Sequence, residues 1–204
     1  MNFLEENINL FRMVNDLGKQ YPYLNPTMVF IAEFTVYFLV LGVIFIWFTR
    51  NKQSRMMIVC ATITFVFAEI IGKIAGKFHS NNQPFAELAN VNKLIEKAVD
   101  NSFPSDHTIL FFSFCVSFWL FRKGWWFLWV ILASLVGISR IWVGVHYPAD
   151  ILVGAIISII SSSIVYLVVP KLSLIQKLLG GYAKCEKLLL SPLTKSKGNR
   201  SKNY

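Results

Sequence analysis

Cysteine and charged residues are both scarce in this chain of 204 residues. The sequence has three cysteines, and charged side chains make up 15% of it. Cys60 and Cys115 lie inside apolar runs and Cys185 lies in a basic C-terminal segment, a spacing that matches neither a metal site nor a disulfide framework. We therefore predict no metal site, no cofactor and no disulfide-stabilised fold.

Familiar catalytic motifs are missing as well. The sequence has no glycine-rich phosphate loop, no HExxH pair and no paired-carboxylate constellation. Their absence argues against a P-loop nucleotide enzyme and against a zinc protease. Glu5 and Glu6 precede the first apolar run and no basic segment opens the chain, which argues against a cleavable signal peptide.

Long apolar runs dominate what is present. Hydrophobic residues make up 55% of the chain, a proportion typical of integral membrane proteins. Five runs are each close to the ~20 residues that a helix needs to cross a bilayer. We predict an all-α membrane protein, with a bundle of about five transmembrane helices within residues 1–170 and a basic amphipathic segment and tail over residues 171–204. The predicted spans are residues 26–48, 56–76, 105–121, 125–143 and 149–169.

The N-terminal segment has a different pattern. Residues 3–18 place apolar side chains at helical spacing among Glu5, Glu6, Arg12 and Asp16. Such a segment is too polar to span a bilayer and is typical of an amphipathic helix in the membrane interface. A soluble helix packed on a loop is an equally good interpretation.

Basic residues are distributed unevenly between the two ends of the predicted spans. The loop after the first span, the loop after the third span and the C-terminal segment together hold 13 basic residues and one acid, Glu186. By the positive-inside rule these segments face the cytoplasm, and the N-terminus lies outside. Topology and anionic lipid explain the net charge of +9 better than nucleic acid does, since no RNA- or DNA-binding module is present.

Two polar clusters lie at the predicted external ends of the spans. FPSDH, residues 103–107, opens the third span, and SRIWVGVHYPAD, residues 139–150, joins the fourth span to the fifth. Ionisable groups at the edge of a membrane span are usually paired and functional. We expect the two clusters to meet at the external face and to form one active site.

The residues of these clusters suit a phosphate group. We expect Pro104 in the first turn of a helix capped by Asn101 or Ser102, so that the free backbone N–H groups of that turn bind an anion. Ser105 adds a hydroxyl donor, and Arg140 adds a planar guanidinium that matches phosphate oxygens.

Two histidines flank this predicted anion site. Asp150, expected in the first turn of a helix that starts at Pro148, can fix the tautomer of His146 and prepare it for nucleophilic attack. His107 can serve as the acid for the leaving oxygen. The clusters thus suit a nucleophilic imidazole beside a bound phosphate, with a second imidazole as the acid.

The same residues carry a resemblance to a known family. Ser105 and His107 within PSDH, and the S-R-x5-H-x3-D pattern that ends at Asp150, resemble the second and third signature motifs of the type-2 phosphatidic-acid phosphatase family. The resemblance implies that His146 attacks the terminal phosphorus to form a phosphohistidine, that Asp150 orients it, and that His107 protonates the leaving oxygen. It also implies that Ser105 and Arg140 hold the phosphate and that no metal is required.

The first motif of that family, K-x6-R-P, is incomplete here. Gln-Pro at residues 83–84 stands where Arg-Pro is expected, and Gly76 occupies the lysine position with Lys77 beside it. By resemblance, Lys77 and Gln83 are the residues expected to contribute to phosphate binding, with Lys73 as an alternative cation.

The chain is similar in particular to bacterial undecaprenyl-diphosphate phosphatases of the bacitracin-resistance type. Its small size, SRIWVGVHYP and the acidic variant PSDH, with Asp106 where the family usually has glycine, carry this similarity over roughly residues 1–170. It implies a lipid diphosphate substrate in the outer leaflet of a bacterial plasma membrane. The residues alone indicate only a phosphate ester or anhydride with a lipid tail.

Two alternatives remain open from the sequence. Phosphatidylglycerol phosphate or phosphatidic acid would suit the same site. A protein of another class, a permease subunit that exports bacitracin, would instead favour polar groups near the bilayer midplane and internal repeats. The sequence also leaves the oligomeric state open.

Overall fold

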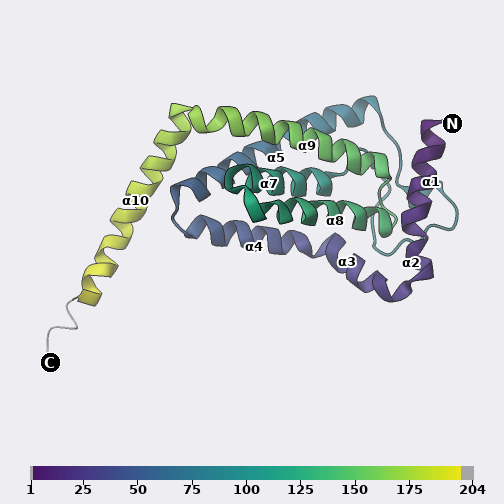
Figure 1. Cartoon of the computed structure of the whole chain (residues 1–204), viewed down its shortest axis with the longest axis horizontal. Helices are drawn as coiled ribbons and strands as arrows, with labels where there is room; N and C mark the ends of the chain where they lie inside the picture. Colours follow the sequence, from purple (N-terminus) through teal and green to yellow (C-terminus); the bar gives the residue numbers. More distant parts are fainter. Residues whose placement is uncertain (1, 199–204) are drawn as a thin grey trace.

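The computed structural model describes the backbone of residues 2–198 and the side chains of residues 2–188. Within this part of the chain every regular element is a helix, and no strand is present. Most of the helices run side by side, whereas the first lies across one end of them and the last leads away from the other end (Figure 1). The prediction of an all-α membrane bundle is confirmed.

The centre of the bundle is α7 (Asp106–Arg122), which packs against α5 (Lys52–Phe78), α8 (Leu128–Trp142) and α9 (Pro148–Val168). Its apolar residues are spread around its whole circumference, a pattern typical of a helix buried on all sides. Ten of its 17 residues are buried, and its phenylalanines form the main hydrophobic core with side chains of α5 and α8. The helix that opens with the FPSDH cluster is therefore held rigidly by its neighbours.

The predicted spans correspond closely to helices, with two differences. By length and composition α5 and the segments Gly124–Trp142 and Pro148–Lys171 can each cross a membrane. Pro22–Glu33 and Thr35–Phe48, bent by 42°, pass the same test only as a pair, which forms either a broken span or a re-entrant loop. Here α3 (Asn25–Glu33) and α4 (Thr35–Phe48) meet at Phe34, where the sequence predicted one continuous span. The predicted third span corresponds to α7, which has 17 residues and is shorter than the three segments that pass the test alone, so the count of five depends on including this central helix.

The N-terminal helix α1 (Phe3–Asn15) lies across the ends of α8 and α9 (Figure 1). Phe11 and Asn15 are completely buried against the bundle, whereas the side chains of Phe3 and Met13 are 73% and 68% exposed. The helix thus packs on the protein, as a packed soluble helix would, and leaves an apolar face uncovered, as an amphipathic helix in the membrane interface would. Two short elements, α2 (Leu17–Gln20) and η1 (Pro22–Leu24), connect it to α3.

The opposite end of the bundle carries α10 (Ser173–Gly198), which follows η3 (Val169–Lys171) and leads away from the other helices (Figure 1). Near its middle, Glu186 accepts a charged hydrogen bond of 2.7 Å from Arg55, and Tyr182 accepts one of 3.1 Å from the indole of Trp47. Residues 199–204 of the predicted basic tail lie outside the described residues.

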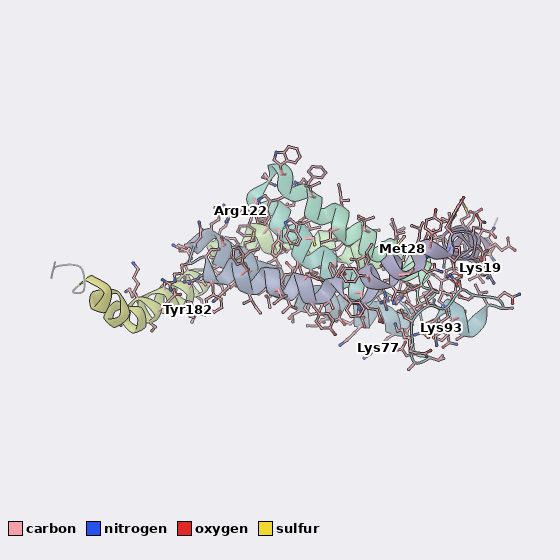
Figure 2. The ribbon with its side chains drawn as sticks, turned by 90° about the horizontal axis from the view of Figure 1, so that it is seen from below. Lys19, Met28, Lys77, Lys93, Arg122 and Tyr182 are labelled. Carbon is pink, nitrogen blue, oxygen red and sulfur yellow. The ribbon has the colours of Figure 1, made fainter. Side chains whose placement is uncertain are left out.

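Two further elements complete the bundle. The short helix α6 (Pro84–Glu87) follows α5 and leads into a loop over residues 88–105, and η2 (Gly124–Phe127) joins α7 to α8. Figure 2 shows Lys77 and Lys93 at one end of the bundle, and Arg122 and Tyr182 at the other. The loop after α6 and the turn between α8 and α9 belong to the same end as α1, so both polar clusters of the sequence lie there.

Candidate active site

The turn between α8 and α9, residues 143–147, carries His146 and is pressed against the 88–105 loop. Gly144 has φ of 86°, which only glycine adopts without strain, and a Cβ at this position would lie 2.8 Å from a methyl carbon of Val91 and 2.9 Å from the Asn92 carbonyl oxygen. The glycine therefore permits both the sharp end of α8 and the close approach of the loop.

A buried asparagine of α1 joins the same two segments. The amide group of Asn15 donates to the carbonyl oxygens of Trp142 (2.8 Å) and Asn92 (3.1 Å), and its oxygen accepts from the backbone N–H of Asn92 (2.9 Å). One side chain thus satisfies backbone groups at the end of α8 and in the loop. Helix α1 helps to position the turn that carries His146.

Asp150 lies behind His146 in the first turn of α9. Its Oδ2 atom accepts hydrogen bonds from the backbone N–H of Tyr147 (2.9 Å) and the hydroxyl of Ser102 (2.8 Å), and the carboxylate is buried. Pro148 occupies the first turn, so the predicted start of this helix is confirmed. Helix geometry and these two donors leave Asp150 a single orientation.

The imidazole of His146 lies between Asp150 and Lys97. Its Nδ1 atom is 3.4 Å from Asp150 Oδ2, and its Nε2 atom is 3.4 Å from the Nζ atom of Lys97. The first distance is longer than an ordinary hydrogen bond, so Asp150 acts on the ring chiefly as a nearby negative charge that favours a proton on Nδ1. The lone pair of Nε2 is then directed away from Asp150.

Burial lowers the pKa of His146, although the nearby carboxylate of Asp150 opposes this effect. The positive charges of Lys97 and Arg140 lower the pKa further. A lowered pKa keeps the imidazole neutral at physiological pH. Neutral imidazole is the form that can act as a nucleophile.

Helix α7 begins later than the sequence suggested. Ser105 is its N-cap and accepts a 3.4 Å hydrogen bond from the backbone N–H of Thr108, whereas Asn101 or Ser102 was expected in this role. The reason is tertiary, because the backbone N–H of Ser105 donates to the Asp150 carbonyl oxygen (3.2 Å). This backbone hydrogen bond joins the two clusters of the sequence directly, since Ser105 belongs to the first cluster and Asp150 to the second.

A cavity of about 520 Å³ lies between the α3–α4 bend, the 88–105 loop and the ends of α7 and α8. His107, Arg140 and His146 line it together, and Asp106 lies at its edge in the first turn of α7. Its remaining lining residues are Glu33, Phe34, Val36, Tyr37, Ile95, Glu96, Lys97 and Asp100. Three of the predicted site residues therefore face one cavity, with Asp150 behind His146 and Ser105 buried at the start of α7.

Arg140 comes from the last turn of α8 and is only 3% exposed. Its Nη1 atom donates to the Ala32 carbonyl oxygen (3.1 Å), which holds the side chain against α3. Its buried Nε atom has no hydrogen-bond partner within the described part of the chain. A buried guanidinium with an unused donor, facing a cavity, is a group prepared to bind an anion.

The structure does not bring Lys77 and Gln83 to this cavity. Lys77 is exposed in the last turn of α5, and neither residue is among the cavity's lining residues. Gln83 is completely buried, where its side-chain amide donates to the Asp100 carboxylate and its oxygen accepts from the Asp100 N–H (3.0 Å). The alternative cation, Lys73, forms a 3.7 Å ion pair with Glu69. The expectation that these residues contact phosphate is therefore not supported by their positions.

Lys97 is the cavity residue that the sequence analysis missed. It lies in the 88–105 loop, outside every recognised motif, and nothing in the sequence distinguishes it from an ordinary surface lysine in a loop. The sequence offered no signal for this position, because the burial of Ile95, which anchors the loop two positions earlier, is a tertiary contact.

Comparison with known proteins agrees with this architecture. Residues 74–174 match the family model described as the PAP2 superfamily. The chain is 52% identical over its full length to the whole of the "Bacitracin transport permease protein BcrC" of Bacillus licheniformis. It is also 36% identical to the "Undecaprenyl-diphosphatase BcrC" of Bacillus subtilis over 157 residues, which are 76% of this chain and 79% of the relative.

A solved structure extends the likeness to three dimensions. The crystal structure of Aquifex aeolicus LpxE superposes with a TM-score of 0.65 at 26% identity, and the match covers 78% of this chain and 93% of that one. The matched family region contains both polar clusters that surround the cavity. Sequence identity over the full length and agreement in fold show that the chain belongs to the PAP2 superfamily.

Proposed function

We propose that this chain is a membrane phosphatase that removes the terminal phosphate of undecaprenyl diphosphate, with undecaprenyl phosphate and inorganic phosphate as products. The observation that carries the proposal is the placement of His146, which has Asp150 on its Nδ1 side and a cavity lined by Arg140 and His107 in front of it. The undecaprenyl-diphosphatase relative at 36% identity supports the choice of substrate. Hydrolysis would return the carrier lipid to wall synthesis and deplete the diphosphate form that bacitracin sequesters.

The first chemical step transfers the phosphoryl group to the protein. The Nε2 lone pair of His146 attacks the terminal phosphorus, a P–N bond forms, and the P–O bond to the bridging oxygen breaks. The electron pair of that bond remains on the leaving lipid phosphate, which receives a proton from His107. Asp150 stabilises the positive charge that develops on the imidazole ring.

The second step returns the enzyme to its starting state. His107, now neutral, takes a proton from a water molecule as its oxygen attacks the phosphorus, and the P–N bond breaks with the electron pair returning to Nε2 of His146. Inorganic phosphate leaves, and His107 is again protonated. Arg140 offsets the charge of the transferred group in both steps, so positioning and charge neutralisation supply most of the catalysis.

The apolar part of the cavity supports a lipid substrate. Phe34, Val36 and Tyr37 line it at the α3–α4 bend. Further along α4, Leu41 and Phe45 are 61% and 75% exposed on a helix suited to lie in the bilayer. A substrate with its diphosphate head group at His146 can therefore place its hydrocarbon tail along α4, where the tail is not exposed to water.

We also propose that the active site faces the outside of a bacterial plasma membrane and that α10 lies in the cytoplasm. Arg50, Arg55 and Arg122 lie near the α10 end of the bundle, opposite the cavity, and Figure 2 shows Arg122 at that end. Basic residues in short loops favour the cytoplasmic side. The outer leaflet is then the source of the substrate.

Cysteine labelling in whole cells tests this orientation. Cys185 is exposed on α10, whereas Cys60 and Cys115 are buried, so the native chain already has one accessible thiol on the proposed cytoplasmic side. A Ser80→Cys variant that also carries Cys185→Ser should react with a membrane-impermeant maleimide in intact cells. The native chain should react only after lysis. The reverse pattern of labelling would place the site on the cytoplasmic side.

Phosphate release by the purified protein in detergent tests the proposed reaction. With EDTA present, we expect phosphate to be released from undecaprenyl diphosphate with kcat/KM at least about tenfold above that for phosphatidylglycerol phosphate or phosphatidic acid, a difference of about 1.4 kcal/mol. A preference for either glycerolipid would keep the site but change the substrate. If activity required an added divalent cation, the proposal that protein side chains alone bind the phosphate and transfer the proton would be wrong.

The name of the relative at 52% identity favours bacitracin export as a second candidate function. The structure offers this function little support, because the ionisable groups of the site lie at one end of the bundle and its middle is filled by Phe111, Phe114 and Phe118. Absence of phosphate release from every lipid, together with bacitracin efflux from vesicles containing the purified chain, would establish export instead.

A further inference from the structure

We propose that Lys97 is a further catalytic residue whose ammonium group binds the phosphoryl group as it is transferred to His146. In this role it replaces the basic residues that the first family motif lacks in this chain. The inference rests on the proposed phosphatase function and adds a residue that lies outside all three motifs.

The position of the ammonium group is the first argument. Lys97 Nζ lies 3.4 Å from His146 Nε2, the atom that would attack phosphorus. A phosphorus atom in contact with Nε2 places its non-bridging oxygens within hydrogen-bond reach of a group that close. Arg140 lines the same cavity, so a transferred phosphoryl group would be in contact with two cations.

The charge balance of the cavity is the second argument. Among its lining residues, four are acids and only Lys97 and Arg140 are lysine or arginine. A diphosphate brings further negative charge into this space. With Arg140 alone, one cation would face four carboxylates, and a net negative site repels the substrate. The acids are Glu33, Glu96, Asp100 and Asp106.

The backbone around Lys97 is anchored on both sides. Two residues earlier, Ile95 is buried in a hydrophobic cluster, and the N–H of Leu94 donates to the Val143 carbonyl oxygen (3.2 Å). Three residues later, Asp100 is joined to Gln83 through both its carboxylate and its backbone N–H. Anchors at both ends hold the lysine in place and reduce the entropy lost when phosphate binds.

The same contacts explain why the cation is found at this position. Gln83, at the arginine position of the first motif, is buried away from the cavity and holds the loop that carries Lys97. At the lysine position, a Cβ on Gly76 would approach the Phe103 carbonyl oxygen to 2.7 Å, so a lysine does not fit there. Both positions of the motif have thus become structural, and Lys97 supplies the missing charge.

The protonation state of Lys97 gives this role a distinctive pH dependence. Burial is the largest cause that lowers its pKa, and the positive charge of Arg140 lowers it further. The carboxylates of Asp100, Asp106 and Asp150 raise it. The ammonium should therefore lose its proton, and activity should fall, at a lower pH than for an exposed lysine. The other ionisable groups that line the cavity with it are Glu33, Tyr37, Glu96, His107 and His146.

Steady-state kinetics of two Lys97 variants test the proposal. Lys97→Met keeps the length of the side chain without its charge, and we expect kcat/KM to fall about 10²-fold. Lys97→Arg should recover most of this loss, and the alkaline limb of its pH profile should move to higher pH because a guanidinium stays charged. The matched control is Lys19→Met, because Lys19 lies at the same end of the bundle (Figure 2), pairs with Asp16 (2.7 Å) and does not line the cavity. This control should retain wild-type kinetics.

The outcomes separate this proposal from the proposed function. Any lipid phosphate that the wild-type protein hydrolyses can serve as substrate, so a different lipid preference leaves the test of Lys97 intact. Wild-type kcat/KM in a folded Lys97→Met variant would rule out the catalytic role. If Lys97→Met does not fold, the alkaline limb of Lys97→Arg decides alone, and an unshifted limb would show that Lys97 is not the group that titrates.

Discussion

Replacement of His146 by alanine is expected to abolish turnover, with kcat lowered by at least about 10³-fold. The reason is that Nε2 of this ring is the atom proposed to form the bond to phosphorus, whereas His107 and Lys97 in the same cavity are proposed to act as the acid and as a cation. Folding should survive, since the ring makes one 3.4 Å contact with Asp150 and one with Lys97 rather than forming part of a hydrophobic core.

Trapping of the phosphoenzyme gives the sharper measurement. A substrate radiolabelled in its terminal phosphate should leave label on the wild-type protein after rapid denaturation in alkali, where phosphohistidine survives, and none on His146→Ala. His79→Ala is the matched control, because His79 is an exposed histidine at the same end of the bundle that packs on Phe103 without lining the cavity. Retained label or substantial activity in His146→Ala would rule out this residue as the nucleophile.

Replacement of Arg140 by alanine is expected to lower kcat/KM by about 10²–10³-fold. The guanidinium already donates to the Ala32 carbonyl oxygen, which fixes its plane, and its Nε atom has no partner in the described part of the chain. Its remaining donors are therefore directed by the protein before substrate arrives. Arg140→Lys should recover only part of the loss, because an ammonium restores the charge without the paired donors.

Initial rates across a range of substrate concentrations measure this effect. The loss should appear in both kcat and KM, since the group contacts the phosphate before and during transfer. Arg122→Ala provides the control, because Arg122 bonds to Ser54 at the opposite end of the bundle. Full recovery in Arg140→Lys would show that charge alone matters and that the planar geometry of the guanidinium does not.

Signals that act along the chain were read correctly from the sequence. Long apolar runs predicted the helices of the bundle, and Pro148 predicted the start of α9 with Asp150 in its first turn. Both predictions depend on hydropathy or on the geometry of a single turn, so each is decided by neighbouring residues. The pattern S-R-x5-H-x3-D likewise covers one continuous stretch, from the last turn of α8 through the turn that carries His146 to the first turn of α9, so its spacing along the chain placed these residues together.

Contacts between distant segments produced the differences. Ser105 caps α7 in place of Asn101 or Ser102 because its N–H donates to the Asp150 carbonyl oxygen, from a residue 45 positions later. The break at Phe34 brings the α3–α4 bend to the cavity, and hydropathy contains no sign of it because both helices are apolar. The motif-based assignment of Gln83 to phosphate binding was not supported for the same kind of reason, since its partner is Asp100 across a loop.

By itself, the sequence determined that this protein is a helical membrane protein with a histidine, arginine and aspartate cluster suited to phosphate, because hydropathy and motif spacing are local properties of the chain. Only the tertiary structure decided which cations share the cavity. Lys97 reaches His146 because Ile95 and Asp100 anchor its loop, whereas Lys77, which is closer to the family pattern, remains exposed on α5. Electrostatic interactions depend on the distance between charges in space, and the separation of two residues along the chain does not predict that distance.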